Sequence, residues 1–211
     1  MKRYNIAIVG ATGMVGRKFI EVLEKRGFPA DECYLFATAK SAGKKLTCFN
    51  VEREVRELTE ENVRALSGKV DYALFSAGGS ASERFAPVFV SIGATVIDNS
   101  SQWRMHDDVP LVVPEVNPED AKLSKGIIAN PNCSTIQAVV ALKPLDDAFK
   151  IKRVVYSTYQ AVSGAGVQGV RDLEDGMRGE PPKKFPHPIA GNILPHIDVF
   201  LQNGYTRKSA K

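Results

Sequence analysis

Residues 130–135, Asn-Pro-Asn-Cys-Ser-Thr, place a cysteine at the predicted joint between a strand and a helix. An apolar run at 126–129 precedes this motif, and the apolar stretch 136–142 follows it. At the start of a helix, Cys133 would feel the positive end of the helix dipole, which lowers the pKa of a thiol and supplies amides for a developing oxyanion. The alternative is a small buried residue, which is the usual fate of a lone cysteine. Cys133 is therefore a candidate nucleophile.

A glycine-rich loop near the N-terminus is the second candidate for chemistry. Residues 10–16, Gly-Ala-Thr-Gly-Met-Val-Gly, follow a predicted strand and open a predicted helix. Their spacing is G-x-x-G-x-x-G, and glycines at these positions allow a tight turn and a close backbone approach, so that a pyrophosphate can bind the amides of the helix N-terminus. A turn that needs glycine only for its backbone angles is the alternative. The position directly after the first strand favours nucleotide binding.

The segment after the second predicted strand favours NADP over NAD. An acidic residue there would bind the ribose 2′-hydroxyl and repel a 2′-phosphate. Residues 38–45, Thr-Ala-Lys-Ser-Ala-Gly-Lys-Lys, contain hydroxyls and lysines and no carboxylate. A solvated basic turn remains the alternative for Lys44 and Lys45. A nicotinamide cofactor together with a thiolate at a helix N-terminus indicates an aldehyde dehydrogenase that works through a thioester.

The elements that must position these groups alternate between apolar strands and helical patterns, which predicts an α/β fold: a Rossmann-type, doubly wound parallel sheet with helices on its faces. From residue 151 the pattern changes, and a longer strand, a glycine-rich loop and a further helix are expected. A capping-box pattern, Ser80 to Glu83, opens the predicted helix 80–91. The predicted strands are 4–9, 33–37, 70–76, 94–98, 126–130 and 153–162, and the predicted helices include 59–66, 80–91 and 170–177.

Composition excludes several classes of protein. The 211 residues are 44% hydrophobic and 25% charged, as in ordinary globular proteins. The net charge is +4, and Arg207, Lys208 and Lys211 supply +3 of it, so the body is too weakly basic for nucleic-acid binding. No apolar run approaches the ~20 residues of a membrane span. Three cysteines without a secretory signal indicate free thiols in a reducing compartment, and we expect a cytoplasmic protein.

Eight segments spread over nearly the whole chain form a recognisable set: residues 10–16, 75–80, 98–104, 112–117, 130–135, 158–166, 185–190 and 195–200. Together they closely resemble the aspartate-semialdehyde dehydrogenase family. One departure is Gly191, where the family usually carries an aromatic residue. The resemblance implies NADP-dependent reductive dephosphorylation of aspartyl 4-phosphate to aspartate 4-semialdehyde, on the route to lysine, threonine and methionine.

The resemblance also implies roles for individual residues. Cys133 matches the acyl-thioester nucleophile, and Gln160 matches the glutamine that positions the substrate. Arg104 matches the arginine that binds the acyl phosphate, and a guanidinium suits such a dianion. The alternative for Arg104 is a surface arginine after a strand, and the alternative for Gln160 is a hydrogen-bonding residue at a strand end. The remaining candidates are Asn132 for substrate; Thr12, Gly13, Met14 and Val15 for the pyrophosphate; Thr38, Lys40 and Ser41 for the adenosine phosphate; and Ser163 and Gly164 for the nicotinamide. No metal site is expected.

The family is considerably longer than this chain, and its general-base histidine, its carboxylate-binding arginine and a phosphate-binding lysine lie beyond residue 211. His106, His187 and His196 do not match that base. We therefore expect a C-terminally truncated copy, with an NADP-binding domain at 1–132 and an incomplete catalytic and dimerisation domain of α+β type at 133–211. Such a copy should bind cofactor with negligible turnover. The family forms homodimers or tetramers, and truncation argues against that assembly here.

Two other functions stay open on the sequence. One is an enzyme like N-acetyl-γ-glutamyl-phosphate reductase, which shares the nucleotide loop and the thiol chemistry. The other is a non-catalytic, NADP-binding fragment or partner subunit.

Overall fold

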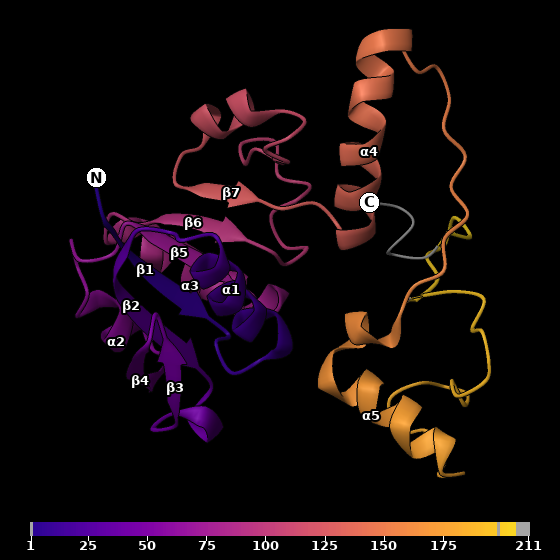
Figure 1. Ribbon diagram of the computed structural model, residues 1–211, viewed down its shortest axis with the longest axis horizontal. Coiled ribbons are helices and arrows are strands. Elements are labelled where there is room, and N and C mark those ends of the chain that lie inside the picture. Colours follow the sequence, from indigo (N-terminus) through magenta and orange to yellow (C-terminus); the bar gives the residue numbers. More distant parts are fainter. Residues whose placement is uncertain (1, 198, 206–211) are drawn as a thin grey trace. The chain divides into compact units, whose positions relative to one another are not determined.

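The computed structural model describes residues 2–197 and 199–205 and divides the chain into two compact units, Met1–Val154 and Val155–Lys211 (Figure 1). The basic residues of the C-terminal tail, Arg207, Lys208 and Lys211, lie outside the described residues. The predicted domain boundary between residues 132 and 133 stays a prediction.

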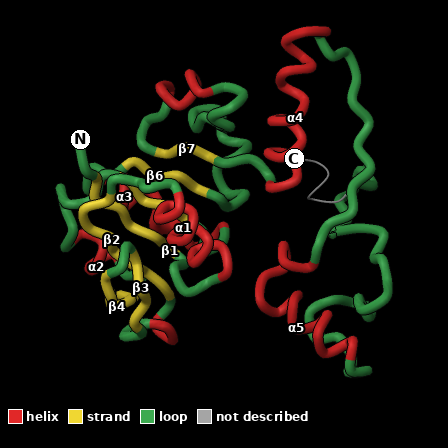
Figure 2. The backbone as a smooth tube through the Cα atoms, in the orientation of Figure 1, coloured by secondary structure: helices red, strands yellow, loops and turns green. Residues whose placement is uncertain are grey.

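The first unit is built on a seven-stranded sheet in the order β3-β4-β2-β1-β5-β6-β7 (Figure 2). Every neighbouring pair is parallel except the β3–β4 hairpin. The strand order reverses beside β1, because the chain runs from β1 to β2 and later adds β5 on the other side. Ligands of open α/β sheets bind at such a switch point, outside the carboxyl ends of the strands. The strands are β1 (Tyr4–Val9), β2 (Ala30–Ala37), β3 (Lys45–Cys48), β4 (Val51–Glu57), β5 (Tyr72–Phe75), β6 (Thr95–Asp98) and β7 (Ile127–Ala129).

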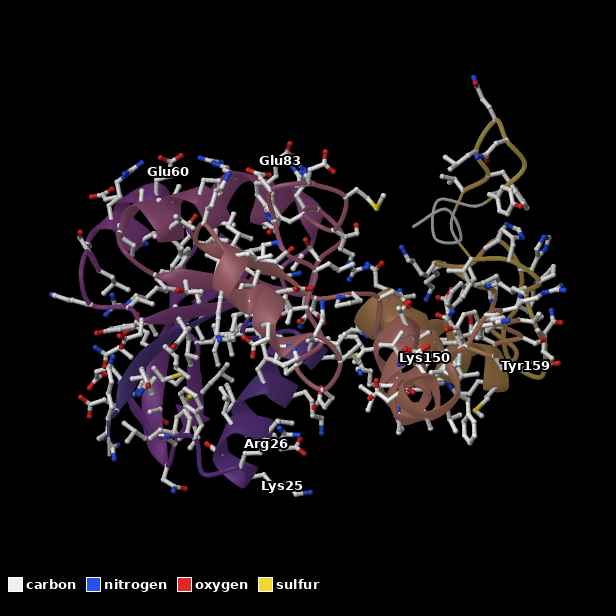
Figure 3. The ribbon with its side chains drawn as sticks, turned by 90° about the horizontal axis from the view of Figure 1, so that it is seen from above. Lys25, Arg26, Glu60, Glu83, Lys150 and Tyr159 are labelled. Atoms are coloured by element: carbon white, nitrogen blue, oxygen red, sulfur yellow. The ribbon has the colours of Figure 1, made fainter. Side chains whose placement is uncertain are left out.

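Helices cover both faces of this sheet, which confirms the predicted doubly wound fold. Figure 3 shows Glu60 and Glu83, on α2 and α3, on one side of the sheet and Lys25 and Arg26, at the end of α1, on the other. Alternate residues of the central strand are buried on opposite faces, since side chains of a strand alternate. The helices of this unit are α1 (Met14–Lys25), α2 (Glu60–Arg64), α3 (Gly79–Ser91) and α4 (Cys133–Phe149).

Two apolar cores result from this arrangement. Ile6 and Ile8 pack with Ile20 of α1, whereas Ala7 and Val9 belong to the core under α2 and α3. In the core under α2 and α3, the ring of Phe89 from α3 packs edge-on against two buried rings of the sheet. Its ring centroid lies 5.6 Å from that of Phe36 and 5.4 Å from that of Phe75. Edge-to-face aromatic pairs of this kind add to the stability gained from burial.

The second unit contains a 3₁₀ turn, Val162–Ala165, followed by α5 (Gly166–Met177), which confirms the predicted helix. Buried Asp172 of this helix accepts hydrogen bonds from the backbone amides of Lys183, Lys184 and Phe185, the last two at 2.6 and 2.9 Å. Burial by itself raises the pKa of Asp172, but the three amides outweigh it and lower the pKa below its usual value. The carboxylate of Asp172 thus fixes the start of the proline-rich loop, residues 181–188.

Three features differ from expectation. The predicted strand 153–162 is wrong: residues 151–161 have no regular secondary structure (Figure 2), because no partner strand lies beside them among the described residues. The predicted capping box is also wrong. The N-cap of α3 is Gly78, whose φ of 88° lies in the left-handed region that favours glycine. The β3–β4 hairpin was not predicted. No helix in residues 2–197 and 199–205 is both long and apolar enough to cross a membrane.

Candidate active site

The glycine loop joins β1 to α1 at the switch point. The amides of Gly10 and Ala11 both donate to the carbonyl of Phe36, so the loop is tied to the end of β2. Gly10 has a φ of 86°, and a Cβ at this residue would lie 2.8 Å from the carbonyl oxygen of Ser76, at the end of β5. A Cβ on Gly16 would lie 2.8 Å from the Cα of Ala11 and closer still to the carbonyl of Gly10. Only glycine allows this close approach of strand and helix.

The residues predicted for the pyrophosphate lie at the N-terminus of α1. Gly13 is the N-cap, and no described side chain accepts a hydrogen bond from the start of the helix. The first backbone N–H groups of α1 therefore remain available as donors. Met14 and Val15 are 41% and 43% exposed. The carbonyl of Thr12 accepts a hydrogen bond from Arg17 Nε at 3.3 Å, and no hydrogen bond of the Thr12 hydroxyl is found among the described residues. The loop can therefore offer amides and a hydroxyl to an anion.

The residues predicted for the adenosine phosphate follow β2 at the same edge of the sheet. Thr38 precedes a short 3₁₀ turn, Ala39–Ser41, and the Ser41 amide donates to the Thr38 carbonyl at 2.8 Å. Lys40 is exposed, Ser41 is partly exposed, and no carboxylate stands among residues 38–45.

The cysteine motif lies between β7 and α4. Cys133 is the first residue of α4 and is exposed, whereas Pro131 before it is buried. Asn132 is the N-cap: its Oδ1 accepts the Ser134 amide at 3.0 Å and lies 4.0 Å from the Cys133 Sγ. The predicted position at a helix N-terminus is confirmed. The amide dipoles of a seventeen-residue helix therefore point toward the thiol.

The other two cysteines, Cys33 and Cys48, are buried. A hydrogen bond to Cys48 and burial raise the pKa of Cys33 far above its usual value, while that hydrogen bond lowers the pKa of Cys48. Both lie in the core beside α1. Cys133 is the single exposed thiol in the part of the chain that the structure describes.

Arg104 joins the carboxyl ends of β6 and β7 close to Cys133. Its Nε donates to the Asn130 carbonyl at 2.7 Å, and its Nη2 donates to the Asn99 carbonyl at 3.1 Å. Partial burial lowers the pKa of Arg104, and the charges of Asp98 and Cys133 oppose this decrease. The guanidinium is thus held by two neutral carbonyls, and no carboxylate of the described residues forms a salt bridge with it. Such a group can bind an anion with its remaining donors.

Sequence reasoning gave no role to Asp98, the last residue of β6. It is fully buried, and its Oδ2 accepts the Ser100 hydroxyl at 2.5 Å. Ser100 Oγ in turn accepts the Gln102 amide at 3.1 Å, which shapes the turn that leads to Arg104. The other oxygen, Asp98 Oδ1, is buried without a hydrogen-bond partner in the described part of the chain. An acidic residue ending an apolar strand was the signal that could have found it.

The remaining candidates belong to the second unit. Gln160 is exposed in the irregular segment after residue 151, and Ser163 and Gly164 are exposed in the 3₁₀ turn that precedes α5. Their placement beside Cys133 stays a prediction. Within the described ranges, no group of three or more His, Cys, Asp or Glu side chains could hold a metal ion.

Comparison with known proteins places this geometry in a family. Residues 5–124 match the family described as the NAD-binding domain of semialdehyde dehydrogenase, and residues 142–211 match its dimerisation domain. The chain is 59% identical to aspartate-semialdehyde dehydrogenase of Aquifex aeolicus over 99% of its own length, which is 63% of the length of that relative.

Solved structures agree. The crystal structure of aspartate semialdehyde dehydrogenase II from Vibrio cholerae, complexed with ASA, aligns with a TM-score of 0.92 at 44% identity, covering 100% of this chain and 64% of that one. The Candida albicans enzyme with NADP aligns with a TM-score of 0.60 at 30% identity, over 71% of this chain and 48% of the other. This chain belongs to the semialdehyde dehydrogenase family.

Proposed function

We propose that the chain carries the cofactor domain and the nucleophile of an NADP-dependent aspartate-semialdehyde dehydrogenase, which interconverts aspartyl 4-phosphate and aspartate 4-semialdehyde. The observation that carries the proposal is the exposed Cys133 at the first position of α4, next to a half-buried Arg104 that has free donors. The relatives that carry this name, including the Vibrio cholerae structure complexed with ASA, support the choice of substrate.

The proposed chemistry follows from these two side chains. The Cys133 thiolate adds to the aldehyde carbonyl, and the amides at the start of α4 stabilise the oxyanion that forms. The adduct is a thiohemiacetal, and it would become a thioester once its hydride has passed to a bound nicotinamide. Arg104 holds a phosphate dianion, whose oxygen attacks that thioester, so that acyl phosphate leaves and the thiolate returns. Asn132 fixes the first turn of α4 through its bond to the Ser134 amide. Gln160 is proposed to orient the substrate beside the thiol.

The glycine loop fits the dinucleotide that this reaction needs. A Cβ at Gly10 or Gly16 would fill the space between strand and helix, and the helix amides have no side-chain cap. When bound, the nicotinamide accepts or supplies the hydride. Thr12, Gly13, Met14 and Val15 would hold the pyrophosphate, and Thr38, Lys40 and Ser41 the 2′-phosphate, whereas Ser163 and Gly164 would lie at the nicotinamide. A neighbouring structure with NADP supports this choice.

We further propose that the active form contains more than one copy of the chain. Residues 142–211 match a dimerisation domain, and large apolar side chains there are exposed, including Val155 at 77%, Tyr159 at 84% and Ile193 at 67%. Exposed apolar surface of this kind favours association. Three free cysteines support a reducing, cytoplasmic location.

A covalent adduct tests the function without requiring sustained turnover. The purified chain is incubated with aspartate semialdehyde and NADP in the absence of phosphate, and intact-protein and peptide mass spectrometry then locate any acyl group. We expect one aspartyl thioester on Cys133, which depends on NADP and disappears when phosphate is added.

Cys133→Ser is the matched control and should carry no thioester. An acyl group on Cys33 or Cys48, or none on any cysteine, would contradict the proposal.

A further inference from the structure

The carboxylate of Asp98, at the end of β6, is buried, and its hydrogen bonds do not compensate fully for the free-energy cost of that burial. Asp98 is 0% exposed, one of its oxygens accepts from Ser100, and the other has no partner among the described residues. A buried charge that lacks partners is destabilising. Holding the turn would not require that charge, because an asparagine oxygen could accept the same Ser100 hydroxyl.

The charge acts on Arg104. Arg104 lies close to Asp98, because its Nη2 donates to the carbonyl of Asn99, the residue that follows Asp98. Asp98 and Arg104 form no salt bridge, and the Arg104 Nε donates to the carbonyl of Asn130. The charge of Asp98 raises the pKa of Arg104, against the effect of burial. A carboxylate in direct contact would occupy the donors that an anion needs. A carboxylate that is near the guanidinium but forms no salt bridge with it leaves these donors free while it offsets part of the positive charge.

We propose that Asp98 is a positioning residue that acts through Arg104: its buried charge offsets the guanidinium and thereby limits how tightly the site binds a phosphate dianion and how strongly it favours the Cys133 thiolate. This rests on the proposed role of Arg104. The benefit is release, because an anion bound too tightly by an unopposed guanidinium would leave slowly.

The test measures two quantities on the 211-residue chain. The first is the rate at which iodoacetamide alkylates Cys133 at about pH 6.5, where an ordinary thiol is mostly protonated. The second is the concentration of inorganic phosphate that halves this rate. The site of Asp98→Asn should be more positive, because the carboxylate charge is lost. Alkylation of Cys133 should be about three- to tenfold faster, and the phosphate concentration that halves the rate should be lower by a similar factor.

Matched variants separate charge from structure. Ser100→Ala keeps the charge and removes a bond of the turn, so its alkylation rate should stay within about twofold of the wild type. Arg104→Gln should shift both quantities the opposite way from Asp98→Asn. If Arg104→Gln leaves phosphate protection unchanged, the proposed role of Arg104 fails, and the offset by Asp98 fails with it.

A merely structural role of Asp98 does not predict tighter phosphate protection. Asparagine can keep the bond to Ser100, so phosphate protection in Asp98→Asn would then stay unchanged, or would need more phosphate if the turn loosened Arg104. Either result overturns the proposal. Cys33 and Cys48 report folding, since buried thiols stay unlabelled in an intact sheet. If they react in Asp98→Asn, the smaller uncharged Asp98→Ser takes its place with the same expected signs.

Discussion

Gly16 sets how closely α1 approaches the end of β1, and Gly16→Ala should separate them. Its Cβ would lie 2.8 Å from the Cα of Ala11 and closer still to the Gly10 carbonyl. Ordinary carbon contacts are about 3.5–4.0 Å, so the helix must retreat by roughly 1 Å. Overpacking against backbone costs about 1–3 kcal/mol, and the better helix propensity of alanine returns about 0.5–1 kcal/mol. A net loss of about 1–2 kcal/mol of unfolding free energy is expected.

The same displacement should weaken cofactor binding. Hydrogen bonds from helix amides to a pyrophosphate weaken once the donor–acceptor distance passes about 3.2 Å, and a shift of ~1 Å crosses that limit. We expect NADPH affinity to fall about tenfold or more, which corresponds to about 1.4 kcal/mol. Urea unfolding followed by circular dichroism measures the loss of unfolding free energy, and titration of NADPH fluorescence measures the loss of cofactor affinity.

Gly13→Ala is the graded control for this change. A Cβ there would lie 3.3 Å from the Gly10 carbonyl oxygen, which a small adjustment of the loop relieves, so it should cost less on both measurements. If Gly16→Ala unfolds and binds NADPH like the wild type, α1 is not held at contact distance and the reasoning is refuted.

Three further predictions concern single side chains. Iodoacetamide should label Cys133 well ahead of Cys33 and Cys48 in time-resolved peptide mass spectrometry, because only Cys133 is exposed; equal rates would contradict this. Lys40→Glu should weaken NADPH about tenfold and leave NADH nearly unchanged, since a carboxylate repels the 2′-phosphate, and paired fluorescence titrations would show equal losses if that were wrong. Asp172→Asn should increase amide hydrogen exchange in α5 at neutral pH. The folded-state pKa of Asp172 is lowered, so its stabilisation is present above about pH 4 and is lost as the pH falls further; a difference between wild type and variant that persists in acid would exclude this cause.

Local patterns in the sequence predicted the first unit well where each element carries its own signal. The apolar run 4–9 became β1 with the predicted bounds, and the apolar stretch after the cysteine motif became α4, beginning at Cys133. Residues 153–162 show why such signals are insufficient. Their β-branched and aromatic side chains favour a strand, but a strand also needs a neighbour that supplies hydrogen bonds, and sequence periodicity does not reveal whether one is present.

The candidate site divides in the same way. Cys133 was predictable because its chemistry and its place at a helix start are both local. Arg104 required the family resemblance, since nothing in its immediate neighbours shows that two strand-end carbonyls would hold its guanidinium. Asp98 was missed because an unpartnered oxygen is a property of the packed structure.

Trp103 precedes Arg104 in the chain, and its indole Nε1 donates to the buried Ser82 hydroxyl of α3 at 2.9 Å. It is the sole tryptophan of the sequence. The chain therefore contains an intrinsic fluorophore anchored to its α3 core and adjacent in sequence to Arg104, the residue proposed to bind the anion. If Arg104 binds phosphate as proposed, the Trp103 emission spectrum, recorded without any attached dye, should follow phosphate occupancy in real time and reveal how fast this edge of the sheet responds.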